Sequence, residues 1–339
     1  MKYRMMGATG LLLSEVGFGT AATSGLMTQG RYEDQRDCVA RAIELGINYF
    51  DTAPDYGEGS SGEIALGRIL RELGVRPVIT TKVEVRQENL GNIAEHIQRS
   101  LDESLDRLGV DYVDVLQIHN GPTVARPQLE GRSYRVLGIE DYFATNGALE
   151  GLTRAQRAGK VRFIGFICRG DDIGPVQQLI NTGLFQMINV PYTLLNPTAG
   201  RPKPDGMMVE PDFGNVLTYA HAHDVGTAIY SPLAAGLLTD QIVNDGAYHP
   251  LSRTYGDPQS FMIERAKALR FLSTPDCSLA QAAYRFILMH PGVTSVLSGV
   301  SELGQLAEVS ATSDADPLTA ESMARVEMVW RAPPRRHEE

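Results

Sequence analysis

Eight short apolar runs recur along the 339-residue chain, separated by longer amphipathic or polar segments. The runs are rich in Val, Ile and Phe, as are strands that are buried on both faces of a parallel sheet. Strands that alternate with helical segments are typical of βαβ units. The predicted strands are 14–21, 47–53, 77–83, 111–119, 161–167, 185–192, 225–233 and 293–300. They predict an α/β fold in which a single (β/α)8 TIM barrel closes on itself.

Helix signals lie between most of these strands, over 34–45, 93–108, 149–158, 174–181, 213–223 and 278–290. Gly46 and Gly109 directly follow two of these segments, where a glycine commonly ends a helix. Ser278 and Pro291 bracket the last one. The alternation therefore continues to the end of the chain.

A doubly wound sheet is the main alternative to a barrel, and it usually opens with a G-x-G-x-x-G turn. The nearest match, GFGT at 17–20, lacks the third glycine and leads into a loop. We therefore expect one barrel domain over 1–332 with an N-terminal β-hairpin, and a flexible tail over 333–339.

Three long connections interrupt the rhythm, over 120–145, 196–212 and 239–258, and each follows a predicted strand. They would lie at the carboxyl ends of the strands, where active sites of this fold are found. Their polar and aromatic residues suit a sugar or an oxidised sugar, although solvated loops would look the same. These residues are Arg126, Arg132, Tyr134, Arg135, Tyr142, Phe143, Arg201, Lys203, Tyr248, His249, Arg253 and Tyr255.

Composition argues against several kinds of partner. The net charge is −10 without a basic stripe, which is unfavourable for nucleic acid. No run of 18 apolar residues and no cleavable leader are recognised, so we expect a cytoplasmic protein without a membrane partner. Cys38, Cys168 and Cys277 are few and far apart, which favours a reducing compartment and no metal. The sequence leaves homo-oligomerisation open.

Four polar residues lie at or just after the ends of three consecutive predicted strands: Asp51, Tyr56, Lys82 and His119. Each alone has an ordinary explanation, such as a turn cap, a solvated lysine or a loop aromatic. Together they are more informative, because a buried lysine is costly unless it is paired, and Asp51 could pair with Lys82. An ammonium beside the Tyr56 hydroxyl would lower its pKa from about 10 and make it a usable acid or base.

The segments GINYFDTAPDYGEGSSGEIALGRIL, VITTKVE and VDVLQIHN closely resemble the aldo-keto reductases. The similarity extends through GKVRFIGF and YSPLAAGLL to VLSGVSELGQL, and it is closest to a bacterial, sugar-dehydrogenase-like branch. The resemblance implies that Asp51, Tyr56, Lys82 and His119 form a catalytic tetrad. It implies hydride transfer between nicotinamide and a carbonyl or alcohol, with Tyr56 as proton donor and His119 hydrogen-bonded to the substrate oxygen.

The resemblance also implies where NADP(H) or NAD(H) binds. Nicotinamide would stack on Tyr230 and lie over Gly19 and Thr20, with Asp51 nearby, and the pyrophosphate would lie under the loop that contains Ser231, Leu233, Gly236 and Leu238. The family usually has Ser-Asn after strand five, where this chain has Ile167 and Cys168. A family Gln is replaced by Asn189. The carboxamide contacts must therefore be partly rebuilt.

The adenosine end departs further from the family pattern. Ser298, Gly299, Ser301 and Gln305 offer hydrogen bonds there, without the Lys or Arg that NADPH-preferring relatives place near the 2′-phosphate. The sequence therefore leaves NAD open beside NADP.

Two other classes remain to be separated from an oxidoreductase. A non-catalytic, nucleotide-binding regulatory subunit of the same fold need not keep all four polar residues. A metal-dependent barrel hydrolase or lyase would need clustered ligands, and only Asp51, Glu84 and His119 approach such a set.

Overall fold

The computed structural model describes residues 1–127, 135–169, 172–245 and 260–332. Eight parallel strands close into a barrel in the order β10-β11-β12-β3-β4-β5-β6-β9. They are β3 (Val16–Gly19), β4 (Tyr49–Asp51), β5 (Val78–Val83), β6 (Val113–Ile118), β9 (Val161–Ile167), β10 (Met187–Pro191), β11 (Gly226–Tyr230) and β12 (Ser295–Ser298). All eight predicted strands are confirmed, as is the predicted TIM barrel.

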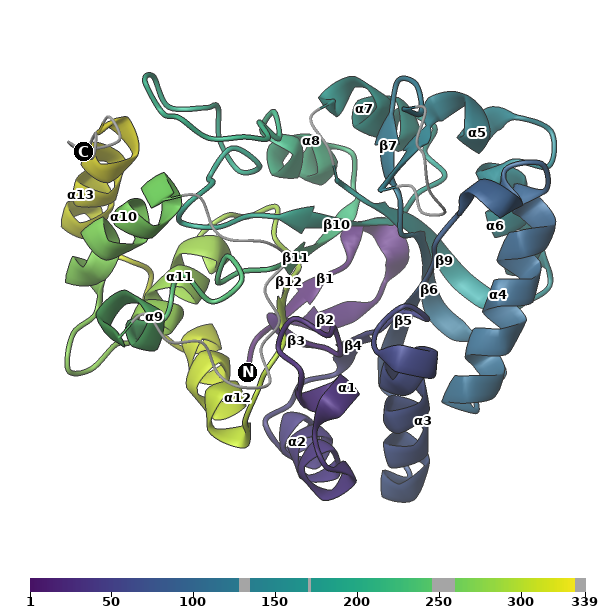
Figure 1. Ribbon diagram of the computed structural model, residues 1–339, viewed down its shortest axis with the longest axis horizontal. Coiled ribbons are helices and arrows are strands. Elements are labelled where there is room, and N and C mark those ends of the chain that lie inside the picture. The colour runs from purple at the N-terminus through teal and green to yellow at the C-terminus, as the bar shows by residue number, and fades with distance from the viewer. Residues whose placement is uncertain (128–134, 170–171, 246–259, 333–339) are drawn as a thin grey trace.

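Helices surround the strands on the outside of the barrel (Figure 1). Those that overlap a predicted helix are α2 (Tyr32–Glu44), α4 (Ile93–Leu108), α6 (Ala148–Arg157), α7 (Ile173–Asn181), α8 (Val216–Ala222) and α11 (Leu279–Leu288). The others are α1 (Leu26–Gln29), α3 (Ser61–Leu73), α5 (Ile139–Phe143), α9 (Asp240–Asp245), α10 (Ser260–Ala268), α12 (Leu303–Ser310) and α13 (Ala320–Arg331). Short 3-10 turns lie at Gly7–Thr9, Glu58–Ser60, Gln87–Asn89, Leu269–Leu272 and Ala311–Ser313.

The helix boundaries follow local chemistry. Gly109 ends α4 with a φ of 67°, a left-handed conformation that glycine adopts without a steric penalty. Ser278 begins α11 by accepting a hydrogen bond from the Gln281 backbone N–H at 3.1 Å, and the Gln281 side chain in turn accepts from the Ser278 N–H. Both positions agree with the sequence expectation.

The predicted N-terminal hairpin is present, formed by β1 (Tyr3–Met5) and β2 (Leu12–Ser14). Met6 and Leu13 are fully buried and belong to a small cluster with Tyr49, Val115 and Met187 of the barrel strands. These apolar side chains fill the amino-terminal part of the barrel. A larger cluster packs the outer face of the sheet against the helices.

Inward-facing side chains become polar toward the carboxyl ends of the strands. Successive inward positions are two residues apart, so Tyr49 is followed by Asp51, Val115 by Gln117, and Met187 by Asn189. The lower layer is apolar and the upper layer is hydrogen-bonded. The barrel therefore has a packed base and a polar floor beneath its carboxyl-terminal opening.

The long connections follow β6, β10 and β11, and two of them contain unpredicted structure. The first carries a two-stranded parallel sheet of β7 (Gly121–Thr123) and β8 (Val136–Gly138), followed by α5. The third begins with α9. The predicted tail 333–339 lies outside the described residues, as do the predicted substrate-loop residues Arg132, Tyr134, Tyr248, His249, Arg253 and Tyr255.

Candidate active site

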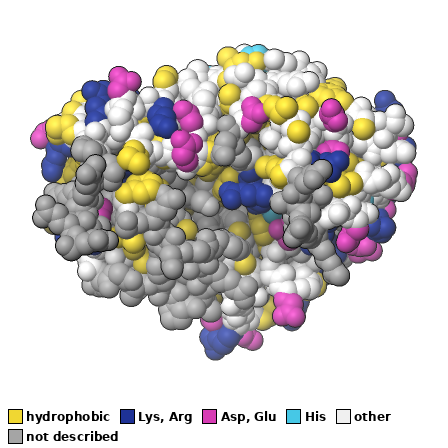
Figure 2. All heavy atoms as spheres, turned by 45° about the horizontal axis from the view of Figure 1, so that its top comes forward, with side chains coloured by type: hydrophobic (Ala, Val, Ile, Leu, Met, Phe, Trp, Pro, Cys, Tyr) yellow, Lys and Arg dark blue, Asp and Glu magenta, His cyan; other side chains and the backbone are white. Residues whose placement is uncertain are grey.

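A cavity of about 760 Å³ opens at the carboxyl ends of the barrel strands. Its volume falls in the range typical of small-molecule sites. Basic side chains, drawn in dark blue, lie near the middle of the face in Figure 2, among uncharged and hydrophobic ones. The described cavity wall includes residues from β3, β4, β10, β11 and β12 and from the connections that follow the strands. The structure therefore has one large pocket where the sequence predicts the site.

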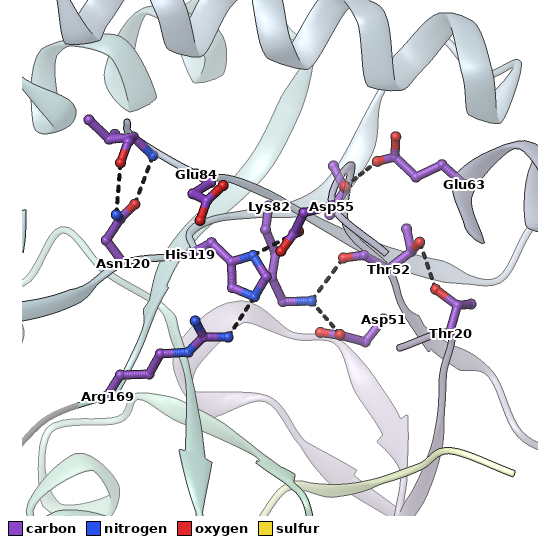
Figure 3. Close-up of polar contacts among 12 residues, drawn as sticks. Thr20, Asp51, Thr52, Asp55, Glu63, Lys82, Glu84, His119, Asn120 and Arg169 are labelled. Atoms are coloured by element: carbon purple, nitrogen blue, oxygen red, sulfur yellow. Dashed lines mark hydrogen bonds and ion pairs between the residues drawn. The ribbon is translucent and has the colours of Figure 1, made fainter. Parts of the chain in front are cut away.

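Lys82 and Asp51 form the expected buried ion pair at the floor of this cavity (Figure 3). Lys82 is fully buried, and its Nζ atom donates to Asp51 Oδ1 and, at 2.8 Å, to the Thr52 carbonyl. The other Asp51 oxygen accepts from Asn189 Nδ2 at 3.0 Å. Burial lowers the pKa of Lys82, while Asp51 acts in the opposite direction.

Tyr56 lies over this pair. The Lys82 Nζ atom is 4.8 Å from the centre of the Tyr56 ring, and the His119 ring meets the Tyr56 ring edge-on at 5.6 Å. The other three residues of the predicted tetrad, Asp51, Lys82 and His119, thus lie around Tyr56. Tyr56 lines the cavity together with Asp51 and His119.

The expected lowering of the Tyr56 pKa is wrong for this structure. Burial raises the pKa of Tyr56 well above 10, and the carboxylates of Asp51 and Asp55 raise it further. The Lys82 ammonium does not lower the Tyr56 pKa as expected, because Asp51 balances its charge at close range. Arg169 is the cation that acts to lower the Tyr56 pKa, and its effect is smaller than that of burial.

His119 is held between two charged residues that the sequence did not single out (Figure 3). Its Nδ1 atom lies 3.0 Å from Asp55 Oδ1, and its Nε2 atom lies 2.9 Å from Arg169 Nη2. Only 2% of the His119 side chain is exposed. Burial lowers the His119 pKa, Asp55 opposes this, and Arg169 adds to it. The imidazole is therefore favoured in its neutral form.

Asp55 is ionised as a consequence of the same contact. Burial alone would raise its pKa, but the hydrogen bond from His119 and the positive charge of Lys82 act in the opposite direction, and the Asp55 pKa is lowered. Asp55 lies one residue before Tyr56 in the loop after β4, so the turn that presents the tyrosine also presents the carboxylate.

Most residues predicted to bind the cofactor line the cavity, namely Gly19, Asp51, Asn189, Tyr230, Ser231, Leu233, Gly236, Ser298, Gly299, Ser301 and Gln305. The Asn189 side chain already makes two hydrogen bonds inside the barrel. Its Oδ1 atom accepts from Gln117 at 2.9 Å, and its Nδ2 atom donates to Asp51. Any further contact of Asn189 must use its remaining hydrogen-bonding capacity.

Three predicted cofactor residues are not in the described cavity wall: Thr20, Cys168 and Leu238. Thr20 is buried and donates to Thr52 at 2.8 Å. The thiol of Cys168 is buried, which raises its pKa to about 12, while Ile167 and Arg169 on either side of it line the cavity. The sequence motifs predict the ends of these strands correctly, but they do not determine which side chains there reach the cavity.

The loop after β11 has the backbone that the predicted pyrophosphate role requires. Ser231, Ala234 and Ala235 have φ angles of 52°, 48° and 55°, and Gly236 follows at 95°. Non-glycine residues rarely adopt this conformation, and such strain is concentrated at binding sites. Successive N–H groups in turns of this kind can form an anion-binding concavity.

Among the predicted substrate-loop residues that are described, Arg135 lines the cavity. Other basic residues of that set pair with carboxylates: Arg126 with Asp141, Arg201 with Glu327 and Lys203 with Glu210. Tyr142 is buried and donates to the Asn120 carbonyl. These contacts hold the loops together, so they do not support a sugar-binding role for this subset.

No described helix is long and apolar enough to cross a membrane. No three His, Cys, Asp or Glu side chains among the described residues are grouped so that they could hold a metal ion.

Comparison with known proteins gives consistent matches over nearly the whole chain. Residues 15–331 match the model of the Aldo/keto reductase family. L-galactose dehydrogenase from Arabidopsis thaliana is 29% identical, with 97% of this chain and 94% of that protein covered. A probable voltage-gated potassium channel subunit beta from the same plant is 28% identical, with 100% and 99% covered. The holo form of aldo-keto reductase AKR11C1 from Bacillus halodurans shares the fold, with a TM-score of 0.73, 24% identity and both chains fully covered.

Proposed function

Because the chain belongs to the aldo/keto reductase family, we propose that it is an NAD(P)(H)-dependent oxidoreductase with Tyr56 as general acid and base. Its substrate would be a carbonyl compound or alcohol, namely a sugar, a sugar derivative or a small aldehyde or ketone. The observation that carries this proposal is the arrangement of Tyr56 against the Lys82–Asp51 pair and His119 on one cavity wall.

The residues of the cavity fit a nicotinamide dinucleotide. The turn from Ser231 to Gly236 has the left-handed residues of an anion-binding concavity. Its Ala234 and Gly236 N–H groups already donate to the Ser231 and Leu233 carbonyls, so the other N–H groups of the turn would hold a pyrophosphate. Tyr230 offers an aromatic face. Gly299 lies against Ser24, where an added Cβ would come within 2.4 Å of the Ser24 oxygen. These residues would hold the dinucleotide between the turn after β11 and the end of β12. When bound, the nicotinamide supplies or accepts the hydride.

The side chains of the protein would then donate or accept the proton that accompanies hydride transfer. Tyr56 keeps its hydroxyl hydrogen at neutral pH because its pKa is raised, so it is ready to donate to a carbonyl oxygen during reduction. Lys82, fixed by Asp51 and the Thr52 carbonyl, stabilises the negative charge that develops on Tyr56. Apolar packing below the polar floor keeps bulk water from this side of the reaction.

NAD(H) is the cofactor we favour. The part of the cavity near β12 and α12 is lined by the carboxylates of Asp240, Glu302 and Glu308, and no described Lys or Arg lines it there. The cavity cations in the described chain, Arg135 and Arg169, belong to the connection after β6 and to the end of β9, across the barrel from β12. A 2′-phosphate beside these carboxylates would be repelled and would lack a charged partner.

A non-catalytic regulatory subunit is the second candidate, because a probable channel beta subunit matches the whole chain. Such a subunit could bind the same dinucleotide without turnover. The two candidates therefore differ in catalysis and not in nucleotide affinity.

The deciding experiment combines nucleotide binding with a substrate screen. Fluorescence titration with NADH and NADPH would be followed by a screen of aldehydes, ketones and aldoses with the nucleotide that binds. Tyr56→Phe removes only the hydroxyl and should reduce turnover by a factor of about 100 or more while leaving nucleotide affinity within about twofold. Tyr112→Phe, at the amino-terminal end of the barrel beside β6, is the matched control and should change neither.

Each outcome decides between the proposals. Binding and turnover that depend on Tyr56 support the oxidoreductase. Tight binding without turnover of any carbonyl compound favours the regulatory subunit. Failure of both nucleotides to bind would remove both candidates.

A further inference from the structure

The two contacts of His119 fix its tautomer. An arginine guanidinium has only N–H donors, so the His119 Nε2 atom, 2.9 Å from Arg169 Nη2, must accept. The proton of the neutral ring is then on Nδ1, which donates to Asp55 at 3.0 Å. In this state His119 has no N–H group to offer a substrate oxygen. This differs from the role that the family resemblance implies for His119.

The N–H groups that face the cavity beside His119 belong to Arg169. Arg169 is half-buried in the cavity wall at the end of β9, and its side chain is recorded in a hydrogen bond with the neutral His119 ring. A guanidinium has five N–H donors, so donors remain for a ligand after those used on His119 and Tyr230. The carboxylate that His119 contacts, Asp55, lies on the opposite side of the imidazole from Arg169 (Figure 3).

A second guanidinium belongs to the same part of the wall. The Arg135 carbonyl accepts from the Gly121 N–H at 3.0 Å, and a Cβ on Gly121 would come within 2.0 Å of the Arg169 carbonyl. The backbones of Arg135 and Arg169 are thus neighbours through Gly121. Both side chains line the cavity and act electrostatically on Tyr230, and neither forms an ion pair with a carboxylate of the described residues.

We propose that Arg169, positioned by His119 and assisted by Arg135, is an anion subsite beside Tyr56 that binds the carboxylate of an oxo acid or hydroxy acid substrate. This inference rests on the proposed function and names its substrate class. A planar guanidinium pairs with a carboxylate through two parallel hydrogen bonds, which fixes the orientation of the substrate as well as its charge. The carbonyl next to such a carboxylate would lie beside the Tyr56 hydroxyl, because Tyr56 and Arg169 both contact the His119 ring.

The chemistry of the transfer is unchanged by this subsite. In reduction, hydride adds to the carbonyl carbon of the oxo acid, the C–O double bond becomes a single bond, and the oxygen takes the Tyr56 proton. The dinucleotide is oxidised and the substrate is reduced to a hydroxy acid. Arg169 binds the carboxylate throughout and exchanges no proton, because a guanidinium stays charged.

The binding test does not depend on turnover. Isothermal titration of the full-length protein with oxalate and with its neutral analogue oxamide measures whether the site selects the anion. Oxalate should bind at least 10-fold more tightly than oxamide, and Arg169→Met should reduce the oxalate affinity by about 10- to 100-fold. Arg157→Met, an exposed arginine on α6, is the matched control and should leave the affinity within about twofold.

The kinetic test uses pairs of substrates in which the carboxylate of one is replaced by a neutral ester or amide in the other. Glyoxylate would be compared with methyl glyoxylate, and glucuronate with glucuronamide, by kcat/KM with NADH. The wild type should prefer each acid, and in Arg169→Met the value of kcat/KM should fall more for each acid than for its neutral partner, so that the preference is lost. Arg169→Lys keeps the charge without the planar fork and should recover only part of the preference.

The outcomes separate this inference from the proposed function. Turnover of neutral carbonyl compounds that depends on Tyr56, with no preference for acids, would overturn the anion subsite and leave the oxidoreductase intact. Binding of oxalate through Arg169 without binding of either NADH or NADPH would support the subsite and remove the oxidoreductase. An equal loss of oxalate affinity in Arg157→Met, or no loss in Arg169→Met, would also overturn the inference.

Discussion

The Nδ1 atom of His119 lies 3.0 Å from the Oδ1 atom of Asp55, and this contact determines which nitrogen of the ring can face the cavity. The His119 side chain is 2% exposed, whereas that of Asp55 is 32% exposed. Asp55 therefore holds the His119 ring from the more exposed side of the barrel opening. Its remaining nitrogen is left to accept from Arg169.

Replacing Asp55 should release the His119 tautomer. In Asp55→Leu the Nδ1–H group loses its acceptor, so both tautomers become populated and the contact with Arg169 weakens. We expect kcat/KM to fall about 10-fold, mainly through KM for an acidic substrate. Asp55→Asn should retain most of the activity, because its amide oxygen still accepts from Nδ1. ¹⁵N chemical shifts of the His119 ring report the tautomer directly, and an unchanged tautomer in Asp55→Leu would contradict this role.

The buried pair of Lys82 and Asp51 should respond differently to single and double replacement. Lys82→Met leaves the Asp51 carboxylate buried without its cation and should lower the free energy of unfolding by about 3–5 kcal/mol. Asp51→Asn combined with Lys82→Met removes both charges and should be more stable than Lys82→Met alone, while turnover stays lost. Urea unfolding measures these differences.

An exposed ion pair provides the control for that comparison. Arg41 and Glu44 on α2 are 2.9 Å apart and largely exposed, so Glu44→Gln should change stability by no more than about 1 kcal/mol. If the double variant proved no more stable than Lys82→Met, the loss would come from packing and not from the uncompensated charge.

The raised pKa of Tyr56 predicts a difference between the two reaction directions. Reduction uses the protonated phenol, so its kcat should not fall between about pH 8 and pH 6 through Tyr56. Oxidation needs the Tyr56 phenolate to accept the proton of the alcohol, so the deprotonated fraction limits the rate and kcat should rise about 10-fold per pH unit from pH 7 to 10. Steady-state rates in both directions, measured in buffers of constant ionic strength, test this. An oxidation rate that levels off near pH 7 would contradict this prediction, because it would mean that bound cofactor lowers the Tyr56 pKa by more than burial raises it.

The acidic end of the cavity predicts the choice of cofactor. Glu302 is exposed at the start of α12 and lines the cavity, so Glu302→Arg replaces a repelling charge with a partner for a 2′-phosphate. NADPH affinity should rise about 10-fold, with little change for NADH. Fluorescence titration measures both affinities. Glu321→Arg on α13 controls for the change in net charge, and a wild type that already prefers NADPH would refute the assignment.

The sequence by itself determined the barrel and the chain positions of the tetrad. Apolar runs and helix signals are local, so eight strands and the ends of α4 and α11 follow from a few neighbouring residues each. The segment 61–73 was not among the predicted helices, although it forms α3. The spacing of Asp51, Tyr56, Lys82 and His119 relative to strand ends likewise places them on one rim. The single domain over 1–332 and the cytoplasmic location stay predictions.

Only the tertiary structure decided how these groups act on one another. Arg169 reaches His119 from a strand end 50 residues away, and nothing in the sequence around either residue indicates that contact. The sign of the Tyr56 pKa shift depends on how deeply the ring is buried and how close each charge lies, and Asp51 balances the one charge that sequence reasoning considered. Burial and distance are properties of packed side chains, whereas a sequence motif specifies only their order along the chain.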